Sequence, residues 1–479
     1  MKMWWISYFG LFLLVGARRE DYDRIGYFWQ ITDIHYDPHY TVHSDYKRGC
    51  WRHENNGGSS SNRNGNKGQR RASDENLGKY GEYNCDSTWE LIESAAKFMK
   101  SRQSDNVEFV LWTGDGLSHF AIKHLSESHQ LEMVQALTDL LGKTFPVQFV
   151  FPALGHDDPP FKKHLGRMWS RWLPTDSIKN FETGGYYIIE RKLRKLQIIV
   201  LNTDLMRTSE ADEDANRQWR WLDKVLFKFE KNKQTAYLVG HVAPGHDERQ
   251  SGLFQPTHKS YSNYHNQKYL DLVRNYSSTI VGQFFGHLHS DTFRVVYDKD
   301  GDPASWAMIA PSITPKRNHL GPNNPALRLY KFNRDTGQVY DYTQYYMDLS
   351  QANSHSKAEW TVEYNFTSYY GLNEISSENL HNLARKFIST GQGVSSLFQR
   401  YHLANTVKVP PHPRDNCDLS CVHNHYCAIT QIDIIDFEEC LKRTAHLRSA
   451  CHISFPSMRF ILVFVLVCSV LRECLSSAT

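Results

Sequence analysis

Five short stretches of the chain each place metal-binding or proton-carrying side chains directly after an apolar run. These stretches are Asp33-Ile34-His35, Gly114-Asp115, Gly155-His156-Asp157-Asp158, Gly240-His241 and Gly286-His287-Leu288-His289. Carboxylates and imidazoles together suit zinc, manganese or iron, and a shared aspartate can bridge two ions. Any one of these stretches alone would more often be a turn or a surface loop. All five in this order favour a two-metal hydrolase.

The segments that would position these side chains alternate between strand-like and helix-like patterns. A capping box at 87–90 begins a helical pattern, and the strand-like runs "VEFVLW", "VQFVFP" and "LQIIVL" that follow it alternate with further helical patterns. Such alternation predicts an α/β layered domain, here over residues 22–352, and open α/β sheets gather ligands at the carboxyl ends of their strands. From about Asn353 the pattern changes, so we expect a mostly helical C-terminal region over 353–450.

Composition is typical of a folded globular protein. The chain has 479 residues, of which 40% are hydrophobic and 13% aromatic, which is ample for a core. Its net charge of +3 and the lack of a basic stripe argue against a nucleic-acid polymer as partner, and we expect a monomer. Residues 54–70 are polar and of low complexity, which predicts a flexible surface loop.

Both ends of the chain carry patterns typical of targeting signals. An apolar run over 3–15 is followed by small residues, so we expect residues 1–17 to be a secretory signal peptide cleaved near Ala17. At the other end, residues 451–479 form a hydrophobic tail with an apolar run over 460–471. The tail fits a glycolipid-anchor (GPI) signal, but a plain secreted tail or a marginal membrane segment fits equally well. The predicted location is extracellular, cell-surface or lysosomal.

The cysteines agree with an oxidising compartment. We expect three disulfides, which are Cys50–Cys85, Cys417–Cys421 and Cys427–Cys440. The four clustered cysteines allow other pairings, and a zinc knuckle is an alternative, although it would normally use a Cys-x-x-Cys pair. Asn275 and Asn365 each begin an Asn-x-Ser/Thr sequence, which predicts glycosylation on a lumenal surface.

The series of motifs resembles the signature of the calcineurin-like metallophosphoesterases, which is D-x-H, G-D, G-N-H-D, G-H and G-H-x-H. Within that superfamily, "DIHYDPHY", "WTGD", "GHVAPG" and "FGHLHSD" resemble the acid sphingomyelinase-like phosphodiesterases over roughly residues 27–445. The sequence shows no cysteine-rich saposin-type segment before these motifs, so the resemblance is to the type 3A/3B branch. It implies a layered α/β metallophosphoesterase sandwich with a helical, disulfide-containing C-terminal region.

The resemblance also implies a role for each matching residue. The ligands of two zinc ions would be Asp33, His35 and His289 for the first, His241 and His287 for the second, and Asp115 as the bridge. The two ions would activate a water molecule for attack on phosphorus. His119, four residues after the bridging aspartate, would protonate or stabilise the leaving oxygen.

The third stretch departs from the family signature. The family has Gly-Asn-His-Asp, whose Asn binds the second metal and whose His contacts the substrate phosphate. Aligned without a gap, His156 replaces the Asn as a ligand and Asp157 replaces the catalytic His, which puts a carboxylate where the phosphate must bind. Aligned with a gap, the Asn is missing and His156-Asp157 matches His-Asp. Both registers are consistent with the sequence.

Two functions from different classes therefore follow. The first is a secreted or surface-tethered phosphodiesterase, weakened by the altered motif, that hydrolyses phosphodiester or phosphoanhydride bonds in nucleotides or phospholipid head groups. The second is a pseudoenzyme or surface regulator that keeps its metals and binds lipid or nucleotide without turnover. The six matching ligand positions and His119 favour the enzyme, because a chain that had lost its function would tolerate wider damage.

Overall fold

The computed structural model describes most of the chain between residues 24 and 452. The described ranges are 24–42, 50, 77–102, 106–249, 260–316, 321–389, 394–409 and 417–452. The predicted signal peptide (1–17), the predicted flexible loop (54–70) and the tail from residue 453 onward lie outside them. Within these ranges, none of the helices combines the length and the apolar character that crossing a membrane requires.

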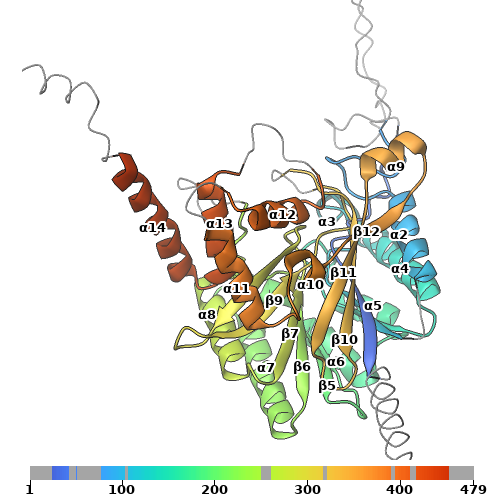
Figure 1. Ribbon diagram of the computed structural model, residues 1–479. Helices are drawn as coiled ribbons and strands as arrows, with labels where there is room; N and C mark the ends of the chain where they lie inside the picture. Colours follow the sequence, from blue (N-terminus) through green and yellow to red (C-terminus); the bar gives the residue numbers. More distant parts are fainter. Residues whose placement is uncertain are drawn as a thin grey trace, which may run out of the picture.

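Two six-stranded sheets form the centre of the described molecule (Figure 1). Their strand orders are β12-β11-β10-β1-β2-β3 and β4-β5-β6-β7-β9-β8. The strands are β1 (Ile25–Ile31), β2 (Val107–Trp112), β3 (Phe149–Pro152), β4 (Tyr187–Ile189), β5 (Leu196–Val200), β6 (Thr235–Val239), β7 (Ile280–Phe285), β8 (Thr292–Tyr297), β9 (Pro303–Ile309), β10 (Ala326–Asn333), β11 (Val339–Met347) and β12 (Trp360–Asn365). β1, β2 and β3 pair in parallel, as do β5, β6 and β7, so their carboxyl ends share one edge in each sheet.

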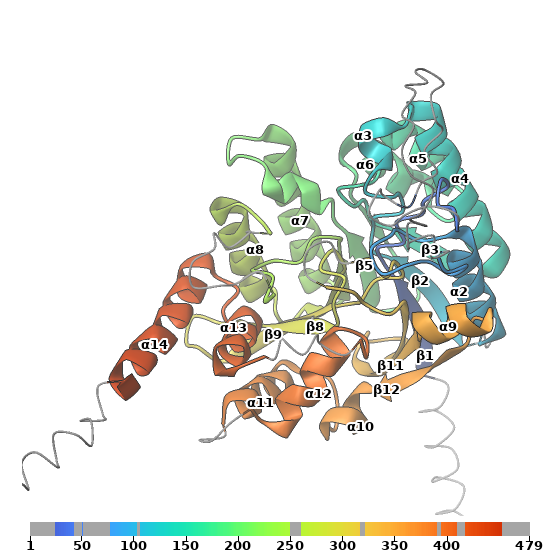
Figure 2. The ribbon, with the colours of Figure 1, turned by 90° about the horizontal axis from the view of Figure 1, so that it is seen from above.

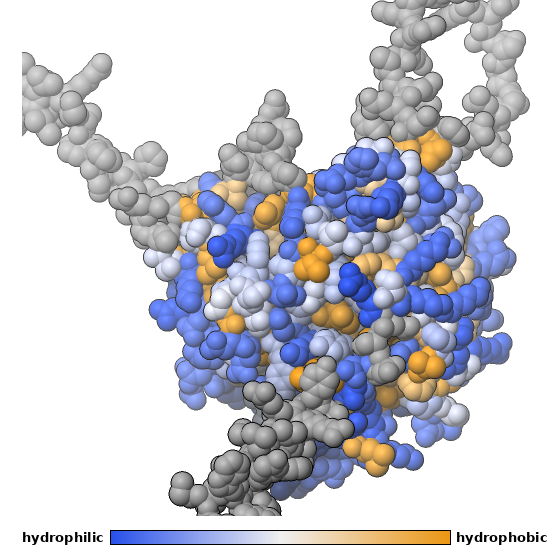
Figure 3. All heavy atoms as spheres, turned by 45° about the vertical axis from the view of Figure 1, so that its right-hand side comes forward, coloured by the Kyte–Doolittle hydropathy of each residue, from blue (hydrophilic) through white to orange (hydrophobic). Residues whose placement is uncertain are grey.

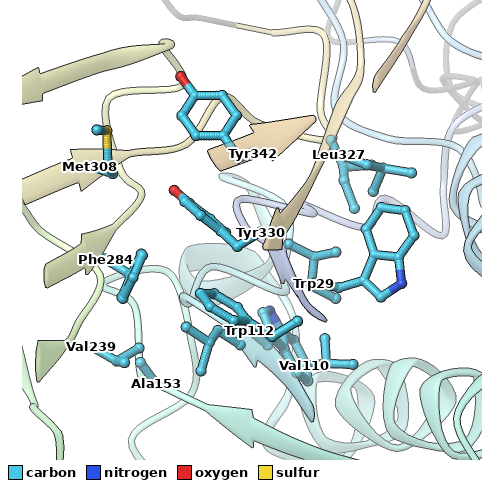
Figure 4. Close-up of a cluster of buried hydrophobic side chains, with 14 of the residues drawn as sticks. Trp29, Val110, Trp112, Ala153, Val239, Phe284, Met308, Leu327, Tyr330 and Tyr342 are labelled. Atoms are coloured by element: carbon cyan, nitrogen blue, oxygen red, sulfur yellow. The ribbon is translucent and has the colours of Figure 1, made fainter. Parts of the chain in front are cut away.

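The two sheets pack face to face through an aromatic core (Figure 4). Phe28 of β1 stacks on Tyr330 of β10 with ring centroids 4.7 Å apart, and it meets Phe284 of β7 edge-on at 5.3 Å. β1 and β7 belong to different sheets, so this contact joins the two halves of the molecule. Buried aromatic rings contribute large contact areas and prefer stacked or edge-to-face geometry.

Helices cover the outer faces of the sandwich (Figure 2). α2, α4 and α5 gather on one side and α7 and α8 on the other. These helices and their neighbours are α2 (Trp89–Ser101), α3 (Ala121–His124), α4 (Glu127–Thr144), α5 (Lys162–Trp169), α6 (Thr175–Gly184), α7 (Glu213–Lys231) and α8 (Asn263–Asn275). α7 buries residues at three- and four-residue spacing, including Trp219, Leu222 and Phe229, as an amphipathic helix must.

The start of α2 differs by one residue from the predicted capping box. Thr88 is the N-cap, and its Oγ1 accepts a hydrogen bond from the backbone N–H of Leu91 at 3.1 Å. Ser87 cannot cap the helix because it stays extended and pairs with the loop after β1, donating its N–H to His35 and accepting from Asp37. Tertiary pairing therefore decides where this helix begins.

The C-terminal helices form a further layer beside the second sheet. The expected boundary after residue 352 falls within α9 (Leu349–His355), and β12 beyond it still pairs with β11 of the first sheet. The remaining helices are α10 (Phe366–Tyr370), α11 (Ser377–Ile388), α12 (Ser396–Asn405), α13 (Leu419–Thr430) and α14 (Ile434–His452). α11 packs on β9 and α13 packs on β8. The disulfides are Cys50–Cys85, Cys417–Cys421 and Cys427–Cys440, as predicted.

The described surface carries apolar residues mainly as isolated side chains. On the face in Figure 3 they are scattered among hydrophilic residues, the pattern of a surface in contact with water. Asn275 and Asn365, the predicted glycosylation positions, are both exposed. Their exposure makes both sequences accessible, and glycosylation itself stays a prediction.

Candidate metal centre

The five motif stretches converge at the carboxyl edges of the two sheets, where they follow β1, β2, β3, β6 and β7. Their ligand atoms, with those of His119, form three groups in each of which all atoms lie within 4.8 Å of one another. The groups are Asp33, His35 and Asp115; His35, His119 and His289; and Asp115, His156, His241 and His287. Asp115 belongs to two groups and joins them, which is the arrangement expected of a bridging carboxylate.

The backbone at this site is held in an uncommon conformation. Five of the ten non-glycine residues with positive φ among the described residues are site residues. They are Asp33 (φ 49°), His35 (φ 45°), Asp115 (φ 53°), His287 (φ 67°) and His289 (φ 52°). Left-handed backbone at non-glycine residues costs free energy and persists where surrounding structure imposes it, commonly at functional sites. The fold thus constrains these five side chains to face one another.

Two glycines allow the backbone to approach the ligands closely. A Cβ on Gly155 would overlap the carboxylate of Asp115, and a Cβ on Gly286 would overlap the side chains of Thr32 and Asp33. Asp33, from the first sheet, also accepts the backbone N–H of His287, from the second, at 2.9 Å. Glycine at both positions therefore lets the two sheet edges close around one site.

Three of the histidines are oriented by backbone carbonyl groups. The Nδ1 of His35 lies 2.8 Å from the carbonyl oxygen of Leu117, that of His241 2.8 Å from Thr113, and that of His289 2.7 Å from Lys316. A carbonyl only accepts, so each Nδ1 carries the proton and donates it. Each Nε2 then faces the site, where the neutral ring can donate its electron pair to a metal, the usual arrangement around a metal-binding histidine.

The site has a strong preference for positive charge. Burial alone would raise the pKa of Asp33, but His289 and His35 hold it well below its usual range. Burial would also raise the pKa of Asp115, but His241 and His156 hold this pKa well below its usual range. Burial lowers the pKa of His241, yet attraction to Asp115 and Asp33 raises it to about 10. The buried carboxylates draw cations into the site.

The residues present fit a pair of metal ions. His287 Nδ1 is buried and has no hydrogen-bond partner among the described residues, which is costly for a polar atom unless a ligand completes the site. The donor atoms are imidazole nitrogens and carboxylate oxygens, a set that suits zinc, manganese or iron. A bound metal cofactor would give His287 Nδ1 the partner that it lacks.

The altered third stretch forms the lip of the site. The carboxylate of Asp158 accepts backbone N–H bonds from Gly155 at 2.8 Å, Asp115 at 2.9 Å and Gly116 at 2.7 Å. His156 Nδ1 lies 3.0 Å from Asp115 Oδ2, and its side chain is 30% exposed. The Asp157 carboxylate lies 4.0 Å from His35 Nδ1. His156 thus joins the group around His241, Asp157 faces His35, and Asp158 secures the loop.

His119 lies over the first group of ligands. Its ring stacks on that of His35 with centroids 4.0 Å apart, and its Nδ1 lies 2.8 Å from Asp86 Oδ1. Asp86 also accepts the backbone N–H of His119 at 3.0 Å, and Lys316 Nζ lies 3.7 Å from the same carboxylate. Sequence reasoning missed Asp86. A single aspartate 33 residues before its partner gives no motif, although its position directly after disulfide-bonded Cys85 fixes it in space.

Fold and site together are those of a calcineurin-like metallophosphoesterase. The family model described as "Acid sphingomyelin phosphodiesterase C-terminal region" matches residues 302–447. Acid sphingomyelinase-like phosphodiesterase 3b of Homo sapiens is 35% identical over 450 residues, covering 89% of this chain and 91% of that protein. The chain therefore belongs to the acid sphingomyelinase-like phosphodiesterases, a family of phosphoric diester hydrolases.

Other relatives carry different substrate names. Cyclic GMP-AMP phosphodiesterase SMPDL3A of Rattus norvegicus is 31% identical over 440 residues, covering 88% of this chain and 92% of that protein. Sphingomyelinase phosphodiesterase C of Dictyostelium discoideum is 30% identical over 446 residues, covering 87% of this chain and 92% of that protein. The family thus includes proteins named for a nucleotide and proteins named for a lipid.

Proposed function

We propose that this chain is a secreted or surface-tethered phosphodiesterase that uses two zinc ions to hydrolyse phosphodiester or phosphoanhydride bonds. The observation that supports this most is the shared position of Asp115, whose carboxylate belongs to two of the three groups of ligand atoms. Zinc suits a site with this many imidazoles. When bound, the two ions supply a water of lowered pKa and neutralise charge on the phosphate. Secretion is supported by the N-terminal pattern and by the three disulfides.

The position of the last aspartate supports one register of the altered motif. Asp158 accepts the backbone N–H of Gly155 in its own loop and those of Asp115 and Gly116 in the loop after β2, so it joins the two loops as the final Asp of the signature would. We therefore assign the gapless register, with His156 as a ligand of the second metal beside Asp115 and His241. Asp157 then takes the place of the substrate-facing His, and its carboxylate repels a phosphate bound next to His35.

His119 is the proton donor in this proposal. Asp86 accepts the hydrogen bond from its Nδ1, so the other ring nitrogen is directed away from Asp86 and is available to the leaving oxygen. A positioned histidine of this kind contributes about 10²–10⁴ in rate. The substrates we expect are small molecules or lipids that contain a phosphodiester, since the family relatives are named for a cyclic dinucleotide and for sphingomyelin.

Hydrolysis of bis-p-nitrophenyl phosphate by the purified full chain tests the proposal. We expect turnover with added zinc, none with excess chelator, and two zinc ions per chain by elemental analysis. His119→Gln should lower turnover by about 10²–10⁴ while leaving bound zinc unchanged. His129→Gln, at an exposed position of α4, is the matched control and should have no effect. A chain that binds two zinc ions and hydrolyses no phosphodiester would instead be the metal-retaining pseudoenzyme.

A further inference from the structure

A second group of metal-ligand side chains lies in the C-terminal helices, outside the metal centre. His402 of α12, Cys417, and Cys421 and His425 of α13 place one ligand atom each within 4.8 Å of all the others. His425 is buried, and the other three are partly exposed, so a solute can reach the group. In the structure Cys417 and Cys421 are joined by a disulfide.

We propose that opening the Cys417–Cys421 disulfide converts this group into a four-ligand site for zinc or another thiophilic divalent cation. A dithiol reductant supplies two electrons and two protons, becomes a disulfide itself, and leaves two cysteine thiols. The cation then displaces both thiol protons and binds two thiolates and two neutral imidazoles. Two sulfurs and two ring nitrogens form the tetrahedral donor set that zinc prefers in structural sites.

Helix geometry places three of the donors where a cation needs them. Cys421 and His425 are four residues apart on α13, so their side chains lie one above the other on the same face. His402 reaches that face from α12, with its ring centroid 5.5 Å from that of His425. Cys421 is also in the first turn of α13, whose N-cap is Asp418, and a helix N-terminus stabilises a thiolate. The helix thus favours the ionised sulfur that a metal requires.

The other two described disulfides are less suited to form a metal site when they open. Cys417 and Cys421 are four residues apart, against 13 for Cys427–Cys440 and 35 for Cys50–Cys85. A disulfide that closes so short a loop restricts the unfolded chain least, so the folded protein loses least when it opens. Cys427 and Cys440 have one histidine beside them, His423, which gives three ligands and not four. Among the described residues, the Cys417–Cys421 pair is therefore the cysteine pair with more metal-ligand side chains around it.

Cobalt absorption of the purified full chain tests this inference independently of catalysis. The metal centre binds through nitrogen and oxygen atoms only, so thiolate-to-cobalt charge-transfer absorption reports cysteine ligands alone. The probe is Co²⁺ with and without a trialkylphosphine, which takes oxygen from water to become the phosphine oxide and adds no competing thiol. We expect one cobalt–thiolate site per chain after phosphine treatment, none before it, and loss of the band on adding zinc.

Matched variants distinguish a metal site at Cys417–Cys421 from one at Cys427–Cys440. His402→Gln, at a partly exposed position, should weaken the cobalt–thiolate site at least about tenfold, whereas His423→Gln should leave it unchanged. Cys417→Ser with Cys421→Ser should abolish the band in protein whose circular dichroism is unaltered. The inference is overturned if the disulfide stays closed under phosphine. It is also overturned if the thiols form without a cobalt band, or if the band follows His423 and not His402.

Discussion

Buried charges occur in two regions of the molecule and are neutralised in different ways. Beside the C-terminal helices, Arg294 pairs with Glu248 at 2.7 Å and Arg328 pairs with Asp291 at 2.6 Å, each pair being almost fully buried. In the metal centre, the ion-pair partners that the described residues offer to Asp33 and Asp115 are histidines alone. The first region balances its charges with arginine, whereas the second holds two carboxylates against groups that can be neutral.

The contrast distinguishes a structural network from a ligand site. None of the four residues of the ion-pair network has a positive φ, while five residues of the metal centre do. Buried ion pairs hold their partners in place at a desolvation cost that the pair itself offsets. Strained backbone and buried unpaired atoms such as His287 Nδ1 are instead retained where a bound group completes the site. Chemistry should therefore depend on the second region and folding on the first.

The largest expected effect is on catalysis at the shared carboxylate. Asp115→Asn removes the charge that two of the ligand groups share, so phosphodiester hydrolysis should fall at least about 10³-fold, which corresponds to about 4 kcal/mol. Zinc per chain should fall as well, measured by elemental analysis on the same preparation. Asp176→Asn, at an exposed side chain, is the control. Full activity in Asp115→Asn would show that this carboxylate is not part of the catalytic site.

A substitution in the Arg294–Glu248 ion pair should lower the stability of the protein and leave its metal content unchanged. Glu248→Gln leaves Arg294 buried without its counter-charge, so the free energy of unfolding should drop by about 3–5 kcal/mol at neutral pH. Denaturant unfolding measures this drop, zinc analysis should show no loss, and Glu210→Gln on the surface is the control. A variant that unfolds normally but loses zinc would contradict the separation of the two regions.

The same substitution should change how stability depends on pH. Burial would raise the pKa of Glu248, but Arg294, with smaller contributions from His425 and Arg249, lowers it from 4.5 to about 2. The folded pKa is below the unfolded one, so the stabilisation is complete above about pH 4.5 and is lost as pH falls toward 2. Glu248→Gln should therefore flatten the decline in stability between about pH 4.5 and 2. An unchanged decline would show that other carboxylates govern it.

Removing the metal from the metal centre should destabilise the folded chain. A ligand that binds only the folded state at 1,000 times its dissociation constant stabilises it by about 4 kcal/mol. Excess chelator should therefore lower the unfolding midpoint, and the decrease should be the same in Glu248→Gln because the two regions act independently. Thermal unfolding with and without chelator, for both proteins, gives the comparison. No response to chelator would mean that the metal centre adds nothing to folding.

The sequence predicted the α/β class, the converging motifs and the three disulfides, because each leaves a local pattern. Apolar runs ending in Gly-Asp or Gly-His mark the carboxyl ends of strands, and parallel pairing brings those ends together. The sequence also states whether each candidate ligand is a carboxylate or an imidazole. Predictions resting on such local signals agree with where the structure places the residues.

Other features depend on contacts that no local pattern records. The carbonyl groups that orient His35, His241 and His289 belong to the backbone and have no residue type. The positive φ at Asp33 is imposed by the surrounding fold, since an aspartate gives no sign of it in the sequence. Asp86 contacts His119, 33 residues further along the chain, from its position next to disulfide-bonded Cys85. Tertiary structure supplies these parts of the site.

The smallest expected effect is a gain of activity at the lip of the metal centre. The double change His156→Asn, Asp157→His restores an amide ligand beside Asp115 and removes the carboxylate 4.0 Å from His35. Like charges repel strongly in a partly desolvated cleft, and a positioned histidine can add about 10²–10⁴ in rate. Hydrolysis of bis-p-nitrophenyl phosphate should therefore rise at least about tenfold.

The two single substitutions show which residue is responsible for the gain in activity. His156→Asn alone should alter zinc content at the second metal, and Asp157→His alone should raise turnover at unchanged zinc content, because only the first residue faces His241. The gapped register makes the opposite prediction, in which His156→Ala alone abolishes activity and the double change gains less. If the parent and the double variant both bind two zinc ions and neither hydrolyses the substrate, the carboxylate at 157 is not what limits turnover. The centre would then serve binding alone, with its five strained residues maintained for the metals and not for the reaction.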